Sequence, residues 1–423
     1  MTRRSAIQLL TAAGAELFPP HLFAGRHLIA RLQRLDPDRL LDDLERAACL
    51  FFWEQADAST GLVKDRALAD GDDKRTIGSI AATGFGLAAL CIAAQRGYRS
   101  RSEAEARAQV ALRFLWESLP NEHGFFHHFV DIRTGERAFR SEVSSIDTAI
   151  LLCGILTCGQ YFSGAAAKLA RQIYERADWQ WMLDGGELLS HGWKPESGFL
   201  AHRWDSYCEL MMLYLLAIGS PRHPIPPGSW DAWQRPIFHY YGYSYIGARA
   251  PLFVHQYSHA WFDFRKRRDR YADYFENSVI ATRAHRRFCI DLHAEFPDYS
   301  EALWGITASD SARGYTVWGG PPRMGPIDGT VVPAAAAGSL PFLPECLDVL
   351  QNLRERFGDK VWRRYGFVDA FNPITEWADP DVIGIDLGIS LLMAENYRTG
   401  SVWRWFMKNP EARAAMGRVG FEP

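Results

Sequence analysis

The sequence predicts an all-α protein built as a double ring of helices, and two observations lead to this prediction. Apolar helices rich in small residues, such as 79–94, alternate with amphipathic helices that carry a charged face, such as 102–119. A helix that is apolar on every side needs shielding, whereas a helix with one charged face suits an outer layer. Strands do not alternate with these helices, which argues against a parallel α/β sheet.

The composition is that of a large folded protein, and it argues against several kinds of partner. Of the 423 residues, 48% are hydrophobic and 23% are charged, which is ordinary for a soluble domain. A formal net charge of −3 gives no basic surface for nucleic acid or an anionic membrane. The aromatic content of 13% suits a core of packed helices, and it also suits a cleft in which rings stack on sugars. The seven scattered cysteines indicate buried apolar residues rather than a disulfide framework.

The first 30 residues resemble a twin-arginine export signal. Arg3 and Arg4 precede a short apolar stretch, although Glu16 interrupts it. We therefore expect a periplasmic or secreted protein, and a cytoplasmic one if the segment is only a basic tail. No segment approaches the roughly 20 apolar residues that a membrane span needs, so we expect no membrane anchor.

The first predicted helix begins at Asp36, with Pro37 in its first turn and an apolar stripe that continues to Phe52. The loop 57–66 follows, and its acidic and basic ends either line a site or lie in solvent. After the helices at 79–94 and 102–119, the segment 124–131 is predicted as an irregular loop or a short strand.

The stretch 140–154 places two carboxylates at the start of an apolar helix. Ser144 and Asp147 have the spacing of a capping box, which would start the helix near Ser145. Asp147 is therefore either a helix cap or a cleft residue. Glu142 has no capping duty and lies just outside the apolar helix end, so it is a candidate catalytic residue.

A third carboxylate lies in the predicted helix 204–218, which follows a helix at 165–181 and a turn-rich loop containing Trp193. Tyr207 and Glu209 interrupt its otherwise apolar run. Burying an unpaired charge costs several kcal/mol, so Glu209 needs a partner or a function. We treat it as a second candidate catalytic residue.

The second half of the chain begins with a proline-rich linker at 221–227. His255, His259 and Asp263 then have the spacing expected for one helical face, which metals can use. No general base accompanies them, and the aromatic residues around them suit a sugar-binding wall equally well. We therefore predict neither a metal nor another cofactor.

A charged helix at 271–287 is followed by polar loops in which functional groups tend to concentrate. Asp310 lies in one such loop and is either functional or part of an Asx-turn. Helices resume at 334 and at 341–357. Further candidate cleft residues are Tyr315, Asp328, Asp369, Glu376, Trp377, Asp386 and Glu395.

Taken in order, these motifs resemble the glycoamylase-like domain family, which includes bacterial endo-β-1,2-glucanases and a domain of cyclic β-1,2-glucan synthases. The matching stretches include Thr60-Gly61-Leu62-Val63, Glu142-Val143-Ser144-Ser145-Ile146-Asp147-Thr148-Ala149, Tyr207-Cys208-Glu209, Gly305-Ile306-Thr307-Ala308-Ser309-Asp310 and Asp328-Gly329-Thr330-Val331. The resemblance covers nearly the whole chain after about residue 40. It implies a single (α/α)6 toroid over residues 36–423, a long cleft along the inner helix ends, and β-glucan as substrate.

This resemblance implies an endo-acting hydrolase of β-1,2-glucan, which we expect to be monomeric. Glycoside cleavage needs one carboxylic acid and one assisting carboxylate. We predict Glu142 as the acid, because desolvation at an apolar helix end raises a carboxyl pKa, and Glu209 or Asp310 as the assistant. The predicted substrate-binding residues are Asp147, Trp193, Tyr207, His255, His259, Trp261, Trp304, Tyr315, Asp328, Glu376 and Trp377.

Three other functions remain open from the sequence. The family also contains transglycosylating members, and no motif in this chain separates them from hydrolases. Toroids of this kind also serve polysaccharide lyases, for which Tyr315 or His255 could act as base on a uronate substrate. A non-catalytic glucan-binding protein is disfavoured, because sugar binding does not require so many cleft acids.

Overall fold

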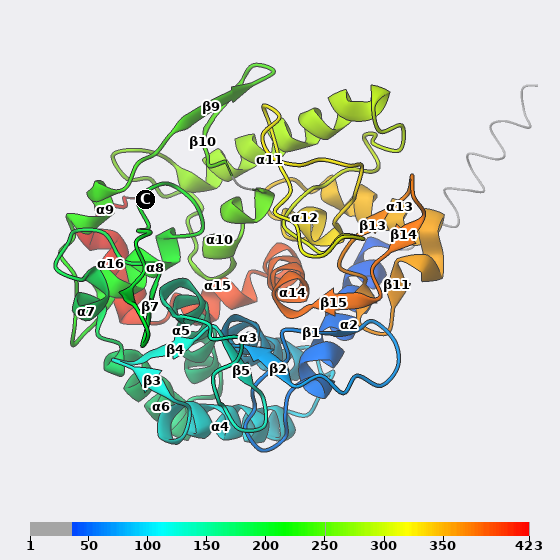
Figure 1. Cartoon of the computed structure of the whole chain (residues 1–423). Coiled ribbons are helices and arrows are strands. Elements are labelled where there is room, and N and C mark those ends of the chain that lie inside the picture. The colour runs from blue at the N-terminus through cyan, green and yellow to red at the C-terminus, as the bar shows by residue number, and fades with distance from the viewer. Residues whose placement is uncertain (1–35, 250, 423) are drawn as a thin grey trace, which may run out of the picture.

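The computed structural model of the protein describes residues 36–249 and 251–422, and its main elements are helices (Figure 1). The export signal predicted for residues 1–30 lies outside the described residues. The predicted helical fold is confirmed, but all-α is too narrow a description, because short antiparallel strands occur between the helices.

One set of helices lies near the centre of the molecule in Figure 1 and is almost entirely buried. Helix α3 packs on α5 and α14, α5 contacts α8, α10 contacts both α8 and α14, and α12 contacts α14. These inner helices are α3 (Ile80–Gln95), α5 (Ser145–Phe162), α8 (Met211–Gly219), α10 (Tyr257–Trp261), α12 (Pro333–Ala337) and α14 (Gly384–Arg398). Their apolar side chains face neighbours on all sides, which explains why their sequences lack a polar face.

A second set of longer, more polar helices surrounds the first. Helix α2 packs on α3 and α14, α4 and α6 cover α3 and α5, α16 covers α8, and α13 covers α12. These outer helices are α2 (Pro37–Glu54), α4 (Arg101–Glu117), α6 (Gly164–Arg176), α11 (Tyr274–Asp291), α13 (Cys346–Phe357) and α16 (Pro410–Arg418). The shorter helices are α7 (Trp179–Leu183), α9 (Ser229–Ala232), α15 (Ser401–Phe406), η1 (Leu252–His255), η2 (Leu292–Ala294) and η3 (Gly358–Lys360).

Helices α3 and α5 meet with their backbones in contact. A Cβ atom added to Gly154 would lie 1.9 Å from the carbonyl oxygen of Gly84, and one added to Gly84 would lie 2.6 Å from that of Ile150. Only glycine fits at such an approach. Helix α5 is the one described helix long and apolar enough to cross a membrane, and most of its residues are buried inside the protein, as in a core helix.

The pairings between the named strands β1–β15 are all antiparallel. The largest sheet has the order β3 (Asn121–Glu122), β4 (Phe125–His127), β6 (Val143–Ser144), β7 (Gly192–Lys194) and β8 (Gly198–Phe199). The pairs are β1 (Arg66–Leu68) with β15 (Asp381–Ile383), β2 (Ile77–Ser79) with β5 (Phe129–Asp131), β9 (Ile237–Tyr240) with β10 (Tyr243–Ile246), β11 (Trp362–Arg363) with β12 (Gly366–Phe367), and β13 (Phe371–Asn372) with β14 (Trp377–Ala378).

Three of these strands lead directly into inner helices and so fix where those helices begin. Strand β2 precedes α3, β6 precedes α5, and β15 precedes α14, in each case with no intervening residue. Helix α5 begins at Ser145 as predicted, and the Ser144 hydroxyl accepts from the Asp147 amide at 3.3 Å. The predicted helix 204–218 is shorter than expected, because α8 begins only at Met211 and leaves Glu209 on the preceding turn.

Candidate active site

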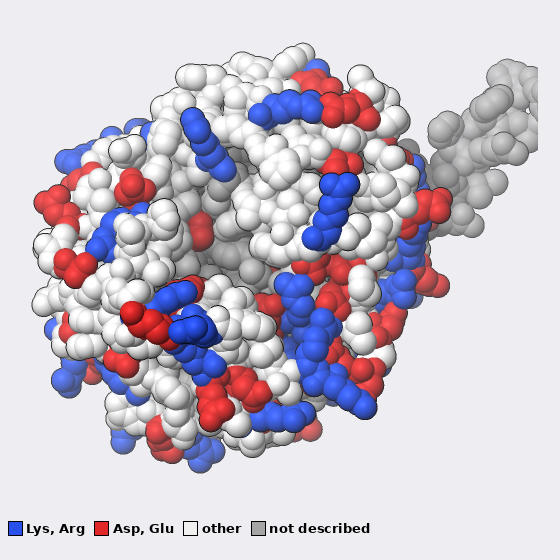
Figure 2. All heavy atoms as spheres, in the orientation of Figure 1, with Lys and Arg blue, Asp and Glu red and all other residues white. Residues whose placement is uncertain are grey.

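A cleft of about 1110 Å³ opens where the first turns of α5 and α14 approach the turn before α8. We call it the central cleft. Figure 2 shows a hollow at the centre of this face, with acidic side chains visible inside it. Four carboxylates line the cleft, from Asp65, Asp147, Glu209 and Asp386. The remaining lining comes mainly from Arg66, His128, Phe129, Ile146, Phe253, Tyr257 and Tyr315.

Hydrogen bonds from Ser258 to the backbone hold Glu209 on the turn before α8. The Ser258 hydroxyl donates to the carbonyl oxygen of Glu209 at 2.7 Å and accepts from the Met212 amide at 3.0 Å. Burial raises the pKa of the Glu209 carboxyl to about 7, and the nearby charge of Asp147 acts in the same direction. About half of the Glu209 carboxyl groups therefore carry a proton at pH 7 and can donate it to a bound molecule.

Beside it, His128 bridges two carboxylates. Its Nδ1 lies 3.2 Å from Oε1 of Glu142, and its Nε2 lies 3.5 Å from Oδ1 of Asp147. Burial alone would lower the pKa of His128, but Asp147 and Glu142 outweigh it and raise that pKa to about 9. A cationic imidazole thus faces the central cleft at neutral pH.

The same bridge overturns what we expected for Glu142. The hydrogen bond with His128 lowers the pKa of Glu142 to about 2, against the opposing effect of burial. The predicted rise is therefore wrong, because a cation, and not only apolar surface, lies beside the carboxyl group. Glu142 also does not line the cleft; it is half-buried behind His128. Its geometry suits a residue that positions His128 rather than a proton donor.

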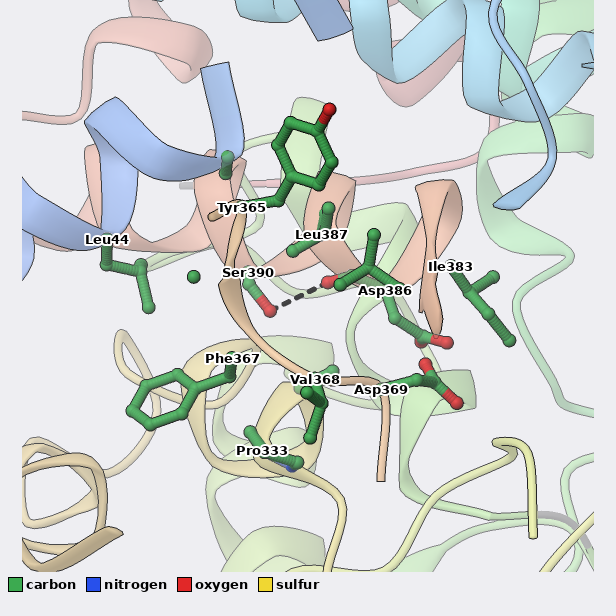
Figure 3. Close-up of a pocket in the computed structure, with 14 residues that line it drawn as sticks. Leu44, Pro333, Tyr365, Phe367, Val368, Asp369, Ile383, Asp386, Leu387 and Ser390 are labelled. Atoms are coloured by element: carbon green, nitrogen blue, oxygen red, sulfur yellow. Dashed lines mark hydrogen bonds between the residues drawn. The ribbon is translucent and has the colours of Figure 1, made fainter. Parts of the chain in front are cut away.

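On the opposite side of the cleft, Asp386 faces a second carboxyl group, that of Asp369 (Figure 3). Both are buried, with 5% and 4% of their surface exposed. Burial raises the pKa of Asp386 to about 7 and also raises that of Asp369, where the charge of Asp386 adds to the effect. The charge of Asp386 favours a proton on Asp369, and the hydrogen bond between the two side chains acts against the effect of burial on the pKa of Asp386.

The desolvation of this pair has a visible cause. Apolar side chains line a small pocket next to the two carboxyl groups, among them Leu44, Pro333, Phe367 and Leu387 (Figure 3). The Ser390 hydroxyl in this pocket donates to the backbone oxygen of Asp386 at 2.7 Å. It therefore does not bond the carboxylate of Asp386.

Asp310 lies close to this pair but is engaged elsewhere. Its carboxylate accepts from Nη1 of Arg66 at 2.5 Å, and its amide donates to Oδ2 of Asp369 at 2.8 Å. Arg66 also donates from Nε to Asp65 at 3.1 Å. Asp310 does not line the central cleft, so it supports Asp369 and Arg66 from behind.

Of the predicted binding residues, Asp147 and Tyr315 line the central cleft, and Tyr207 lines a neighbouring groove. Trp261 and Trp304 are fully buried in the core, so the prediction that they stack on substrate is wrong. Trp193 packs against Trp181, and Glu376 and Trp377 belong to the β13–β14 hairpin; none of them lines the cleft. Asp328 accepts from the Thr330 amide in an exposed turn and also lies outside the cleft.

His255 and His259 are buried as well. His255 Nδ1 lies 3.0 Å from the Tyr207 hydroxyl, and His259 Nε2 lies 3.1 Å from that of Ser278. Burial lowers the pKa of each histidine to about 3, so both are neutral. Within residues 36–249 and 251–422, no group of three or more His, Cys, Asp or Glu side chains is arranged to hold a metal ion.

The sequence did not single out His128 or Tyr257, and it named Asp386 without a role. A signal for Asp386 was present. Ser145-Ile146-Asp147 and Gly384-Ile385-Asp386 each open an inner helix directly after a short strand, and each places its aspartate third. No comparable local pattern marks His128, which strand pairing brings beside Glu142.

Comparison with known proteins identifies the family of this chain. The Glycoamylase family model, described as "putative glucoamylase", matches residues 201–410. A solved structure with the same description from Bacteroides fragilis is 30% identical, with a TM-score of 0.84, and the match covers 92% of this chain and 98% of that one. The chain therefore belongs to the glycoamylase-like family.

Two other relatives carry more specific names. An endo-β-1,2-glucanase from Chitinophaga pinensis, solved with sophorotriose and glucose, is 27% identical with a TM-score of 0.85, over 92% of this chain and 99% of that one. An exo-β-1,2-glucooligosaccharide sophorohydrolase acting at the non-reducing end, from Parabacteroides distasonis, is 28% identical over 90% of this chain. The chain spans 58% of the length of that curated relative.

Proposed function

We propose that this protein is a glycoside hydrolase that cleaves β-1,2-glucan at internal linkages. The observation that carries the proposal is the central cleft, in which Glu209 and Asp386 present carboxyl groups with pKa values of about 7. The names of the Chitinophaga and Parabacteroides relatives support β-1,2-linked glucose as the substrate class.

We further infer that residues 36–423 form a single (α/α)6 toroid. Six inner helices are linked through the contacts α3–α5, α5–α8, α8–α10, α10–α14, α12–α14 and α14–α3, and outer helices cover them. The likeness to the Chitinophaga structure supports this architecture. In such a ring the inner helix ends converge on one face, which is where the central cleft lies.

In the proposed mechanism Glu209 is the general acid and protonates the glycosidic oxygen of the leaving sugar. Asp386, whose charge favours a proton on Asp369, is the assisting carboxylate. Asp147 and the cationic His128 lie beside Glu209 and supply an acceptor and a donor for sugar hydroxyls. Tyr257 and Phe253 offer apolar faces to the pyranose rings.

The test compares wild-type protein, Glu209→Gln and Glu187→Gln on linear β-1,2-glucan, with products separated by chromatography. Glu187 is an exposed glutamate outside the cleft and serves as the matched control. We expect short oligosaccharides from the wild type and the control, and a rate about 10²–10⁴-fold lower from Glu209→Gln, because a general acid contributes about that much.

Each other outcome has a definite meaning. Intact polymer after incubation with the wild type would refute the substrate class. Cyclic or lengthened products would indicate transglycosylation, and an unsaturated product that absorbs in the near ultraviolet would indicate a lyase. Wild-type activity in a folded Glu209→Gln variant would refute the role of Glu209.

A further inference from the structure

A second groove, of about 1300 Å³, lies between the segment 203–208 and the β9–β10 hairpin. We call it the hairpin groove. Its lining includes Trp204, Asp205 and Tyr207 on one side, and Ile237, Phe238 and Arg249 on the other. None of these residues lines the central cleft.

The two hollows share a wall. Cys208 lines the hairpin groove, and the next residue, Glu209, lines the central cleft. On the same wall, Nε1 of Trp204 donates to the Ser145 hydroxyl at 2.9 Å, and Ser145 precedes the cleft residue Ile146. The central cleft and the hairpin groove are therefore neighbours at residues 208 and 209.

The chemistry of the hairpin groove suits a sugar chain. His191 stacks on the buried Trp204 with the ring centroids 3.9 Å apart and the planes 16° apart, so Trp204 holds the half-buried His191 ring at the groove. Ile237 is 54% exposed although it is large and apolar, and it lines the same groove. Asp205 and Arg249 are exposed polar groups on the same groove. Apolar faces with a few polar groups match pyranose rings and their hydroxyl rims.

We propose that the hairpin groove is a second arm of the glucan-binding site and holds the glucose units on one side of the scissile bond, while the central cleft holds those on the other. This inference rests on the proposed function. It explains how Glu209 reaches an internal linkage, because a chain that occupies both arms passes the carboxyl group with sugar units on either side.

The experiment measures kcat/KM on a long linear β-1,2-glucan and on the shortest oligosaccharide that the wild type cleaves. The groove variants are Arg249→Ala and Ile237→Ser, and the matched control is His239→Ala, an exposed residue of β9 outside the groove. Because these positions are exposed, we expect all three to fold, and thermal melting verifies this. The ratio of long-chain to short-chain kcat/KM should fall at least about tenfold in Arg249→Ala, which loses a charged hydrogen-bond donor, and less in Ile237→Ser.

The remaining outcomes separate the two proposals. Unchanged ratios in both groove variants, with an active wild type, would overturn the second arm and leave the hydrolase function standing. Equal losses on long and short substrates would also overturn it, since the groove residues would then act on the fold or the catalytic centre. A wild type that cleaves no β-1,2-glucan would overturn both proposals.

Discussion

Two walls of the central cleft each carry an aspartate at the start of an inner helix. The group beside that aspartate is a cation on one wall and a second carboxyl group on the other. On the α5 wall Asp147 is the third residue of an inner helix that follows a short strand, and on the α14 wall Asp386 holds the same position. Beside Asp147 stands His128, whose pKa is raised to about 9. Beside Asp386 stands another carboxyl group, that of Asp369 (Figure 3). Local sequence places the acid, and a partner distant in the chain sets its charge.

This difference assigns the walls different tasks. A carboxylate paired with a cation is stabilised in its charged form and is suited to holding a substrate hydroxyl. A carboxylate in a poorly solvated site has a raised pKa even where a neighbour donates a hydrogen bond to it, and it is suited to proton transfer. The α14 wall therefore carries the chemistry in the proposed mechanism, together with Glu209.

The largest expected effect comes from exchanging each aspartate for asparagine. Asp386→Asn should reduce kcat on β-1,2-glucan about 10²–10⁴-fold, because it removes the assisting carboxylate. Asp147→Asn should raise KM more than it lowers kcat, because Asp147 acts through binding. Steady-state kinetics on both variants measures the contrast. Equal losses of kcat would contradict the division of tasks between the walls.

An intermediate effect is expected from Glu142→Gln, which removes one of the two carboxylates that hold His128. The pKa of His128 should fall below about 9 while Asp147 keeps it raised, and an NMR titration of the imidazole measures this. The variant should also lose about 1–3 kcal/mol of stability at pH 6, between the values for exposed and buried pairs.

The pH dependence of that loss follows from the two shifts. The lowered pKa of Glu142 contributes stability that is present above its unfolded value and is lost as pH falls towards about 2. The raised pKa of His128 contributes stability that is complete below about 6.5 and is lost as pH rises through about 9. The stability gap between wild type and Glu142→Gln should therefore narrow above pH 9. The control Glu136→Gln, at an exposed position of the same loop, should show no gap.

These contrasts also show what could be predicted from the sequence. The start of α5 at Ser145 and the unusual position of Glu209 were predictable, because a cap and a charge in an apolar run are local signals. The pKa of Glu142 was not, because His128 lies 14 residues earlier and only the β4–β6 pairing brings it near. Trp261 and Trp304 were misassigned for a related reason: an aromatic residue has the same local signature in a core and in a sugar cleft.

The smallest expected effect is that of Asp369→Asn on the pH dependence of stability. This variant tests whether Asp369 and Asp386 titrate together. Raised carboxyl pKa values mean that ionisation costs more in the folded state, so this pair lowers stability as pH rises from about 4 through about 7. Asparagine keeps a hydrogen-bond donor for Asp386 but removes the second titrating group. The variant should therefore lose less stability than the wild type between pH 5 and pH 8, by roughly 1 kcal/mol, in urea denaturation at both values. Asp359→Asn, at an exposed site, should follow the wild type. A variant with the wild-type pH slope would mean that Asp369 does not titrate together with Asp386.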